Sequence, residues 1–449
     1  MTLNKNLAKK IICAAPPSVE LSGNYRFLFK LFSPLDKIIQ DWALRQTDFF
    51  SENDWKEIQL KKLKKILVHT GESVSYWRKL FKEINFRPET FQDFSELHKI
   101  SPVTRADIKK IPIEKFTALN IPRWRFKEAF TSGSTGEPLK FYQDLRDNLR
   151  REVNTLHELR YAGVSYLDHI AILGLGNHQD LDNFGRRFKW DDKKFRESVI
   201  YSYLKLKPAV LIAGGSDLRR FLFLVRRETS NIVFKTLIYR GEHLSESERD
   251  NISRFFKCPI FTTYGSRETS LLGIECENHK LHLAPWMNYF EIVSDKGEAV
   301  PDGSEGNAVV TFFENFAMPF IRYKIGDRAI INAESCSCGR KSKTIVLYGR
   351  ESEIIKFPGS DKNVAVVNLA RRINENYYKE IKQYQFELRG ENLIIFRYVP
   401  NMAFTETGKK HLSSLLGEAL KHQFQIVLEE TVIINPSANG KTPILIRNL

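Results

Sequence analysis

Residues 208–263 read PAVLIAGGSDLRRFLFLVRRETSNIVFKTLIYRGEHLSESERDNISRFFKCPIFTT and alternate short apolar runs with amphipathic ones. Short apolar runs predict buried strands, and amphipathic runs predict helices. We expect strands at Pro208–Gly214, Phe234–Arg240 and Pro259–Thr263, and helices at Asp217–Arg227 and Glu246–Phe256. This alternation predicts an α/β fold with a largely parallel sheet covered by helices on both faces. Ligands of such sheets bind beyond the carboxyl ends of the strands, where Gly241 and Tyr264-Gly265 fall.

Toward the N-terminus the pattern continues with a predicted strand at His169–Gly176 and a helix over residues 142–161. Just before them lies a glycine-rich loop, Thr131-Ser132-Gly133-Ser134-Thr135-Gly136, followed by Lys140. Glycines let the backbone approach a ligand closely, and hydroxyl and N–H groups can donate to phosphate oxygens. It is not a Walker A loop, because no Gly-Lys-Ser/Thr closes it. On its own it fits an anion-binding loop and a Ser/Gly surface turn equally well.

Toward the C-terminus strands separated by glycines replace the helices, which predicts an antiparallel subdomain. We expect its strands at Tyr289–Val293, Ala308–Phe313 and Arg328–Ile331. A domain boundary is predicted near Gly349-Arg350, and the elements beyond it describe a small α+β domain. These are strands at Ile354–Phe357, Tyr384–Leu388, Leu393–Tyr398 and Thr431–Ile434, and helices at Ala365–Asn374 and Lys409–Gln423.

The first 90 residues contain an aromatic and basic stretch at residues 25–32, which could contact a membrane surface or a partner helix. Burial of an N-terminal helix against the rest of the protein is the favoured reading, because apolar stripes usually belong to a core. From Asp54, a candidate N-cap, apolar residues recur at helical spacing. The predicted solvated face of this helix carries Lys61, Lys62, Lys64 and Lys65.

Length and composition predict a globular protein of two or three domains, because the chain has 449 residues and 42% of them are hydrophobic. No apolar run approaches the ~18 residues of a membrane span. The apolar stretch at residues 11–15 is too short for a signal peptide. Five scattered cysteines fit a reducing compartment, so we expect a cytoplasmic protein.

The net charge of +15 favours anionic partners such as nucleotides, coenzyme A, nucleic acid or acidic lipids. No aromatic residues alternate with the lysines at 61–65 as stacking platforms for bases. We therefore do not expect a nucleic-acid partner, although nucleic-acid binding is one class that the charge leaves open. The sequence also leaves open that the protein forms a homodimer.

Six short motifs follow one another along the chain. They are the loop at residues 131–136, Arg240-Gly241-Glu242, Thr262–Glu268, Ile321–Asp327, Gly349-Arg350 and Asn439-Gly440-Lys441. Their order resembles the core motifs of the adenylate-forming superfamily, over about residues 90–449. Cys336-Ser337-Cys338-Gly339-Arg340 and Lys280-Leu281-His282-Leu283 are similar to the phenylacetate–coenzyme A ligase branch, which includes coenzyme F390 synthetase-like and CapK-like proteins.

The resemblance implies that ATP activates a carboxylic acid, such as an aryl acid. An acyl-adenylate forms, pyrophosphate leaves, and the acyl group passes to an acceptor. Coenzyme A is the leading acceptor, and an amine or hydroxyl in polysaccharide or natural-product biosynthesis is the alternative. A non-catalytic relative that binds a nucleotide is the third reading.

The resemblance also assigns roles around the triphosphate. The loop from Thr131 to Gly136, with Lys140 near it, would hold the β- and γ-phosphates. Glu268 would bind Mg²⁺. Lys441 would bridge the attacking carboxylate and the α-phosphate, where a flexible ammonium suits charge that develops in the transition state.

Around the nucleoside, Tyr264-Gly265 would stack on adenine beside Gly241 and Glu242, and Asp327 would accept hydrogen bonds from the ribose hydroxyls. Arg350 would contact the ribose or a phosphate, and the segment after it would let the small domain rotate. Each residue taken singly also has a structural reading: Tyr264 as a core aromatic, Glu268 as a helix N-terminal acid and Asp327 as part of a turn.

The hinge and the motif around Asp327 depart from the usual superfamily pattern. Ser352 stands where an acidic residue is common, and Ile325 stands where threonine is usual. These departures put ordinary thioester formation in question. For the acid pocket we expect Tyr239, Thr262 and Ser266 as lining residues, with Arg267 placed to counter a second carboxylate.

The cysteines supply a candidate metal site. Cys276 and His282, followed by Cys336-x-Cys338, offer three thiolates and an imidazole, which is a tetrahedral zinc set. His279 is a competing fourth ligand, and reduced, partly buried cysteines without a metal are the alternative. Four protein ligands would make a closed, structural site, and the resemblance favours a metal here because some members of the branch carry one.

The predicted organisation has three parts. Residues 1–90 form an N-terminal helical segment of the large domain, residues 91–348 form the adenylate-forming core with the ATP site, and residues 349–449 form a small, mobile domain that carries Lys441.

Overall fold

The computed structural model describes residues 2–13, 37–131, 138–165, 168–173, 185–188, 207–228, 232–242, 244, 246–360, 363–377, 380–400, 404–434 and 443–448. Three predicted features lie outside these residues: the loop positions Ser132, Gly133, Ser134, Thr135 and Gly136, the catalytic candidate Lys441, and the stretch at 25–32. Within the described part of the chain, every helix is too short or too polar to cross a bilayer.

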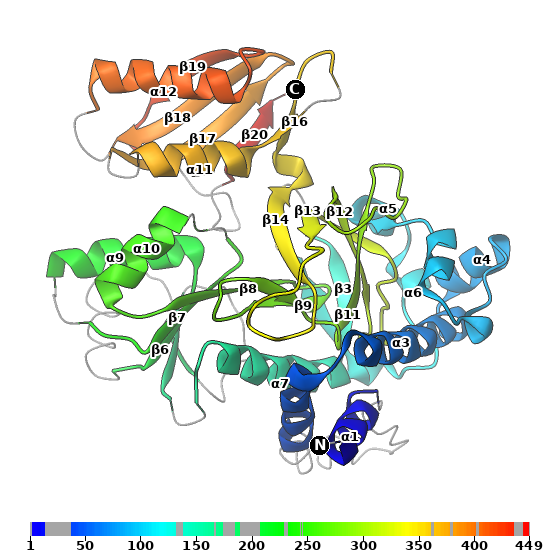
Figure 1. Ribbon diagram of the computed structural model, residues 1–449. Coiled ribbons are helices and arrows are strands. Elements are labelled where there is room, and N and C mark those ends of the chain that lie inside the picture. The colour runs from blue at the N-terminus through cyan, green and yellow to red at the C-terminus, as the bar shows by residue number, and fades with distance from the viewer. Residues whose placement is uncertain are drawn as a thin grey trace.

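A 12-stranded sheet runs through the large part of the molecule (Figure 1). Its parallel strands are β4 (Ile170–Leu173), β5 (Gly185–Phe188), β6 (Val210–Gly214), β7 (Thr236–Arg240) and β8 (Ile260–Ser266). Helices α7 (Leu145–Tyr161), α9 (Gly215–Glu228) and α10 (Glu246–Phe256) cover it. Alternate residues of β6 show the two faces, because Leu211 packs in the cluster of α9 and α10, whereas Ile212 packs in the cluster with Leu159 of α7. The predicted α/β fold is confirmed.

Antiparallel strands continue the same sheet beyond β8. They are β9 (Ser270–Glu275), β10 (Leu281–Leu283), β11 (Asn288–Val293), β12 (Glu305–Phe312), β13 (Tyr323–Ile331) and β14 (Thr344–Arg350), with the short β1 (Val103–Thr104) parallel to β13. A separate hairpin joins β2 (Phe126–Phe130) to β3 (Lys140–Asp144) and flanks the glycine-rich loop. The expected antiparallel part is therefore present as an extension of the parallel sheet.

Helices of the first 125 residues pack beside the antiparallel strands (Figure 1). They are α1 (Thr2–Cys13), α3 (Glu52–Ser73), α4 (Ser75–Glu83), α5 (Arg105–Lys109) and α6 (Ile113–Phe116), with 3₁₀ turns η1 (Gln46–Phe49), η2 (Pro88–Thr90), η3 (Phe94–Lys99) and η4 (Arg123–Arg125). Two details of α3 correct the sequence prediction. Ser51 is the N-cap, and Asp54 returns the hydrogen bond as the third residue of a capping box.

Lys62 is the second correction, since it is buried and not solvated. Its ammonium donates to the Trp286 carbonyl at 2.7 Å and forms an ion pair with Glu314, which is also buried. Burial lowers the pKa of Lys62, and the charge of Glu314 opposes that shift. A lysine pattern cannot reveal such a position, because Glu314 lies far away in sequence and meets α3 only in the folded chain.

Arg322, just before β13, is completely buried, with backbone φ of +42°. Its guanidinium lies 3.1 Å from Glu291 and donates to the carbonyls of Ile100 and Leu97. A buried charge of this kind is tolerated only when it is paired and hydrogen-bonded. Arg322 therefore joins the η3 segment to the start of β13, which carries site residues.

The C-terminal part is a second unit above the large sheet (Figure 1). After η6 (Glu351–Glu353) it contains β15 (Ile354–Lys356), β16 (Asn363–Ala365), α11 (Val366–Tyr377), β17 (Ile381–Arg389), β18 (Leu393–Pro400), α12 (Glu406–Ala419), β19 (Gln425–Glu430) and β20 (Leu445–Asn448). The four-stranded sheet β19-β18-β17-β20 shares one apolar core with both helices. The predicted strand at Thr431–Ile434 is wrong: the strand is Gln425–Glu430, whose alternating exposure is typical of a sheet edge.

His157 of α7 gives a testable pH dependence. Its ring is almost fully buried, edge-on to Trp286 and Tyr161, and neither ring nitrogen has a hydrogen-bond partner among the described residues. Burial, aided by the charge of Arg160, lowers its pKa from 6.5 to about 3. The folded state thus disfavours the protonated form. Stability from this group is intact above pH 6.5 and falls as the pH drops toward 3, by about 2 kcal/mol between pH 7 and pH 5.

His157→Phe should keep the ring packing and remove the proton-binding group. We expect the variant to lose less thermal stability than wild type when the pH falls from 7 to 5, measured by differential scanning calorimetry. Equal losses in the two proteins would contradict this account of His157.

Candidate ATP site

Two of the predicted nucleotide-binding motifs lie side by side at the carboxyl ends of β7 and β8. The register pairs Arg240 with Thr263, so Gly241 and Tyr264 follow at the same edge of the sheet. Gly241 has φ of +76°, which only glycine adopts readily, and the chain turns there. Arg240 is the last residue of β7, and its guanidinium donates hydrogen bonds to the buried Glu158 of α7. Glu242 has the guanidinium of Arg219 3.8 Å from its carboxylate.

Two tyrosines connect this edge to β13. The Tyr264 hydroxyl donates to Asp327 Oδ2 at 2.7 Å, and the Tyr323 hydroxyl donates to Glu268 Oε1 at 3.1 Å. Strands β9, β10 and β14 separate β8 from β13 in the sheet order, so the sheet must curl for these groups to meet. The curl brings the motif around Tyr264 and Glu268 against the motif around Asp327.

Arg350 completes the group from β14. It is directly opposite Asp327 in the strand register, and its Nε lies 3.4 Å from Asp327 Oδ1. Burial raises the pKa of Asp327, while Arg350 and the Tyr264 hydroxyl act in the opposite direction. Burial also raises the pKa of Glu353. A carboxylate and a guanidinium thus face each other where the chain passes into the C-terminal unit.

The neck of the glycine-rich loop is closed by two hydrogen bonds. Thr131 N–H donates to the Leu139 carbonyl at 3.0 Å, and Leu139 N–H donates to the Thr131 hydroxyl at 2.9 Å. Lys140 forms an ion pair with Glu128 across the hairpin, and its ammonium lies 5.5 Å from the centre of the Tyr142 ring. Lys140 therefore points along the hairpin here, and a phosphate contact stays a prediction.

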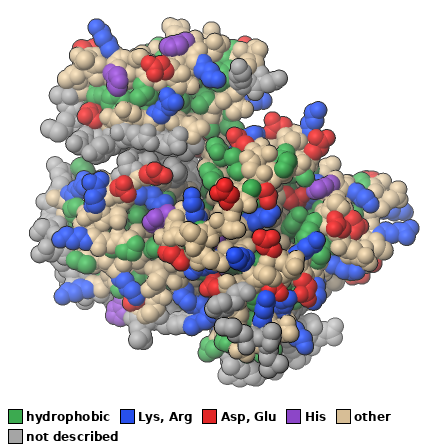
Figure 2. All heavy atoms as spheres, viewed as in Figure 1, with side chains coloured by type: hydrophobic (Ala, Val, Ile, Leu, Met, Phe, Trp, Pro, Cys, Tyr) green, Lys and Arg blue, Asp and Glu red, His purple; other side chains and the backbone are tan. Residues whose placement is uncertain are grey.

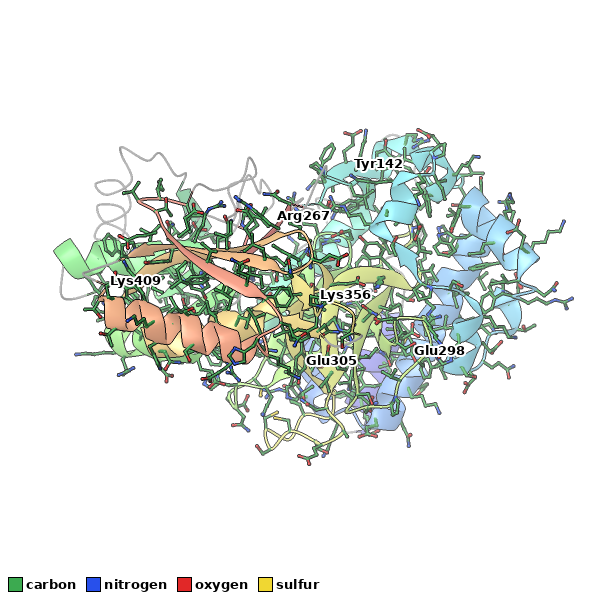
Figure 3. The ribbon with its side chains drawn as sticks, turned by 90° about the horizontal axis from the view of Figure 1, so that it is seen from above. Tyr142, Arg267, Glu298, Glu305, Lys356 and Lys409 are labelled. Atoms are coloured by element: carbon green, nitrogen blue, oxygen red, sulfur yellow. The ribbon has the colours of Figure 1, made fainter. Side chains whose placement is uncertain are left out.

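Arg267, labelled in Figure 3, belongs to the motif Thr262–Glu268 and contacts the strand before the glycine-rich loop. Its Nη1 donates to the Phe130 carbonyl at 2.9 Å, just before the loop, and Gln143 donates to the Arg267 carbonyl at 3.3 Å. Arg267 thus ties the turn that bears Glu268 to the base of the glycine-rich loop. Of the expected pocket residues, Thr262 donates from its hydroxyl to the Tyr239 carbonyl at 3.1 Å. Ser266 lies 2.8 Å from the Thr269 hydroxyl.

The turn at Gly265 has no room for a larger side chain. A Cβ at this position would lie 2.5 Å from the Ser270 carbonyl oxygen, so the backbone would have to shift. We expect Gly265→Ala to displace Tyr264 and Glu268 and to weaken ATP binding about tenfold or more, measured by calorimetric titration. Gly408→Ala is the control, because its Cβ would make only ordinary contacts in helix α12. Unchanged ATP affinity in Gly265→Ala would contradict this placement.

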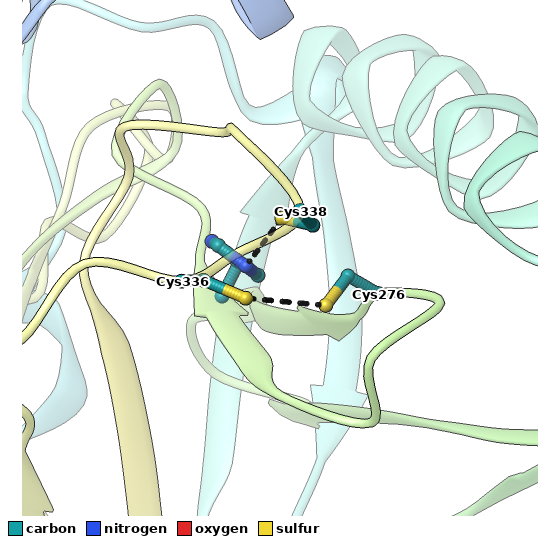
Figure 4. A group of neighbouring side chains, drawn as sticks. Cys276, Cys336 and Cys338 are labelled. Atoms are coloured by element: carbon teal, nitrogen blue, oxygen red, sulfur yellow. Dashed lines mark hydrogen bonds between the residues drawn. The ribbon is translucent and has the colours of Figure 1, made fainter.

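The four predicted zinc ligands come together (Figure 4). The ligand atoms of Cys276, His282, Cys336 and Cys338 all lie within 4.8 Å of one another. Cys276 follows β9, His282 lies on β10, and the other two lie between β13 and β14. Sγ of Cys276 and Cys336 are 3.8 Å apart, and Cys338 Sγ is 3.3 Å from His282 Nε2.

The surroundings of the cluster fit a metal. His282 Nδ1 lies 2.9 Å from the Ser342 carbonyl, which leaves Nε2 as the nitrogen that faces the sulfurs. Burial raises the pKa of the Cys276 thiol to about 12, so a thiolate there needs a cation. His279 is not a ligand, since its Nδ1 lies 2.9 Å from Glu275 and outside the cluster.

Sequence reasoning missed the role of Tyr323. Tyr323 lies inside the motif Ile321–Asp327. From the sequence alone, a tyrosine that follows Ile321 and Arg322 cannot be distinguished from a core aromatic. Only the fold places its hydroxyl on Glu268. The interaction of Arg240 with Glu158 was missed for the same reason, because the partner belongs to a helix whose register was not known.

No family model matches this chain. It is 25% identical over 295 residues to the phenylacetate-coenzyme A ligase of Aromatoleum evansii, an alignment that covers 62% of this chain and 66% of that protein. It is 21% identical over 407 residues to protein CapK of Staphylococcus aureus, which covers 83% of this chain and 84% of CapK.

A solved structure of 2-hydroxyisobutyryl-CoA ligase, in the postadenylation state in complex with R3-HIB-AMP, superposes with a TM-score of 0.76 at 16% identity, over 90% of this chain and 92% of that one. The chain therefore has the fold of this CoA ligase. The resemblance to the phenylacetate–coenzyme A ligase and CapK-like branch is confirmed by the sequence relatives. The same ligase in the thioesterification state, in complex with 2-HIB-AMP and CoA, gives a TM-score of 0.61 at 16% identity, over 90% and 92% of the two chains.

Proposed function

We propose that this chain uses ATP to activate a carboxylic acid, such as an aryl acid, and then transfers the acyl group to coenzyme A. The observation that carries the proposal is the meeting of Tyr264, Glu268, Asp327 and Arg350 at one edge of the curled sheet. These residues come from three segments that are distant in sequence, and the motifs predict that Tyr264, Asp327 and Arg350 contact ATP and that Glu268 binds Mg²⁺. Independent turns and core aromatics would have no reason to converge.

In the first step an oxygen of the substrate carboxylate attacks the α-phosphorus of ATP, and the bond to the bridging oxygen of pyrophosphate breaks. Asp327 and Arg350 hold the ribose side of the nucleotide, and Tyr264 packs against the adenine. Glu268 suits a cation, because Oε1 is fixed by Tyr323 while Oε2 accepts no hydrogen bond from the described residues. When bound there, Mg²⁺ supplies positive charge that offsets the triphosphate.

Lys441 and the loop from Ser132 to Gly136 take the remaining roles in this proposal. The loop surrounds the leaving pyrophosphate, and Lys441 reaches the α-phosphate from the C-terminal unit. The chain superposes better on the postadenylation state than on the thioesterification state. We expect the C-terminal unit, residues 349–449, to rotate between the two steps. Acyl transfer then forms a C–S bond to coenzyme A and releases AMP.

We propose Zn²⁺ as the occupant of the cluster formed by Cys276, His282, Cys336 and Cys338. Four protein ligands leave no open position, so the metal has a structural role. The loop that bears two of these cysteines also contacts the helices: Arg340 lies 3.2 Å from Asp48 and over the ring of Tyr161 at 4.3 Å. The metal would therefore fix the loop between β13 and β14 against the N-terminal part.

Amide or ester formation is the second candidate. The chain aligns with CapK over 83% of its length and with the Aromatoleum ligase over 62%. A nucleotide-binding relative without catalysis is the third.

Basic and acidic side chains are interspersed on the face shown in Figure 2, so this face offers no continuous basic surface for nucleic acid. A cytoplasmic location, a homodimer and contact with a membrane surface stay predictions.

A pyrophosphate-release screen tests the proposal. Aryl, fatty and amino acids are offered with ATP and Mg²⁺, with and without coenzyme A. We expect release to depend on one class of acid, and a thioester to appear only with coenzyme A. Release that needs an amine or alcohol for turnover would favour the second candidate. ATP binding without release for any acid would favour the third.

A further inference from the structure

The two tyrosine–carboxylate contacts form a crossed pair between β13 and the end of β8. Tyr264 comes from β8 and donates to Asp327 of β13, whereas Tyr323 comes from β13 and donates to Glu268 in the turn after β8. Each segment therefore supplies one hydroxyl and one carboxylate. The consequence is that neither carboxylate can change its orientation without changing a contact to the other segment.

The Tyr323 side of this pair is closely packed. The tyrosine is 3% exposed and its ring lies 5.0 Å from that of Phe320. Its backbone pairs with Val310 of β12 on one side and with Val103 of β1 on the other. The phenol is thus held by neighbours on both sides, and its hydroxyl has a fixed position relative to the sheet.

Glu268 is held from its backbone as well. Its turn is closed by the Ser266 hydroxyl, which accepts from Thr269 N–H at 3.0 Å and lies 2.8 Å from the Thr269 hydroxyl. The side chain is 9% exposed, so little water competes for its oxygens. With the backbone held and Oε1 hydrogen-bonded to Tyr323, Oε2 is the oxygen that accepts no hydrogen bond from the described residues.

We propose that Tyr323 is a positioning residue, which orients the Glu268 carboxylate so that Oε2 faces the metal bound to ATP. This inference rests on the proposed function. Tyr323 itself touches neither ATP nor the reacting atoms. Its removal should leave the nucleotide site intact and weaken the coupling between metal and ATP, because Glu268 then adopts other rotamers.

The test compares the ATP dissociation constant in Mg²⁺ with that in EDTA, measured by calorimetric titration without any acid. In wild type, Mg²⁺ should tighten binding. In Tyr323→Phe this tightening should fall about tenfold, while the constant in EDTA is unchanged. Tyr289→Phe is the matched control, because it removes a hydroxyl from a half-buried tyrosine of the same sheet whose ring stacks on Phe94.

A double-variant cycle makes the test independent of small folding effects. Glu268→Gln should abolish the tightening by Mg²⁺, and adding Tyr323→Phe to it should change nothing further. Wild-type tightening in Tyr323→Phe, or equal weakening in Mg²⁺ and EDTA, would overturn the inference and leave the proposed function standing. Absence of ATP binding by the wild type would overturn both.

Discussion

Lys441→Ala is expected to lower the rate of acid-dependent ATP–pyrophosphate exchange by about 10²- to 10³-fold, the range seen when a group that stabilises transition-state charge is removed. The ammonium is proposed to contact charge that develops as the carboxylate attacks phosphorus. Substrate affinity depends on other residues, so the dissociation constant of ATP should change little. The measurement is isotope exchange between pyrophosphate and ATP at saturating acid.

Two controls give this prediction its specificity. Lys410→Ala removes an exposed lysine from α12 of the same unit and should leave exchange unchanged. Acyl transfer from a pre-formed acyl-adenylate to coenzyme A should also persist in Lys441→Ala, because we propose that this step uses a different orientation of the unit. A variant that exchanges pyrophosphate at the wild-type rate would remove Lys441 from the catalytic site.

Loss of the metal should have the second-largest effect, on stability and not on chemistry. We expect purified protein to contain zinc, and Cys338→Ala to lose it and to be destabilised by about 2–5 kcal/mol, as is typical when a metal site is lost. The physical reason is that the ligands lie just after β9, on β10 and in a separate loop, which a bound metal would join. Zinc content by mass spectrometry and thermal unfolding check this together.

Cys258→Ala is the matched control for that variant. Cys258 is buried in the cluster of α9 and α10, away from the four ligands, so its loss costs packing and no metal. Full zinc content in Cys338→Ala, or zinc-free wild-type protein of the same stability, would contradict a structural metal site.

The elements that the sequence predicted best are those whose own pattern determines them. The helix Glu246–Phe256 and the strands around residues 210–214 and 236–240 carry their periodicity locally, and each was found at the expected place. The strand at Thr431–Ile434 was misplaced because Val432 and Ile433 are apolar yet exposed. Burial of Lys62 depended on a distant partner, Glu314, and no local pattern records such a pairing.

The residues of the site divide in the same way, into those that a local sequence pattern predicts and those that depend on the fold. Motif order was enough to nominate Tyr264, Glu268, Asp327 and Arg350, since each belongs to a short stretch with turn or strand chemistry. It could not predict that the sheet curls across β9, β10 and β14, and the crossed tyrosine contacts depend on that curl. The residues of the acid pocket depend on side-chain packing in the same way.

Acid-dependent release of pyrophosphate from ATP tests the proposed reaction. We expect release that requires a carboxylic acid and Mg²⁺ and that is lost in Glu268→Gln and Lys441→Ala. A coenzyme A thioester should form when coenzyme A is present. Binding of ATP with no release for any aryl, fatty or amino acid, in wild-type protein of full zinc content, would contradict the proposed reaction.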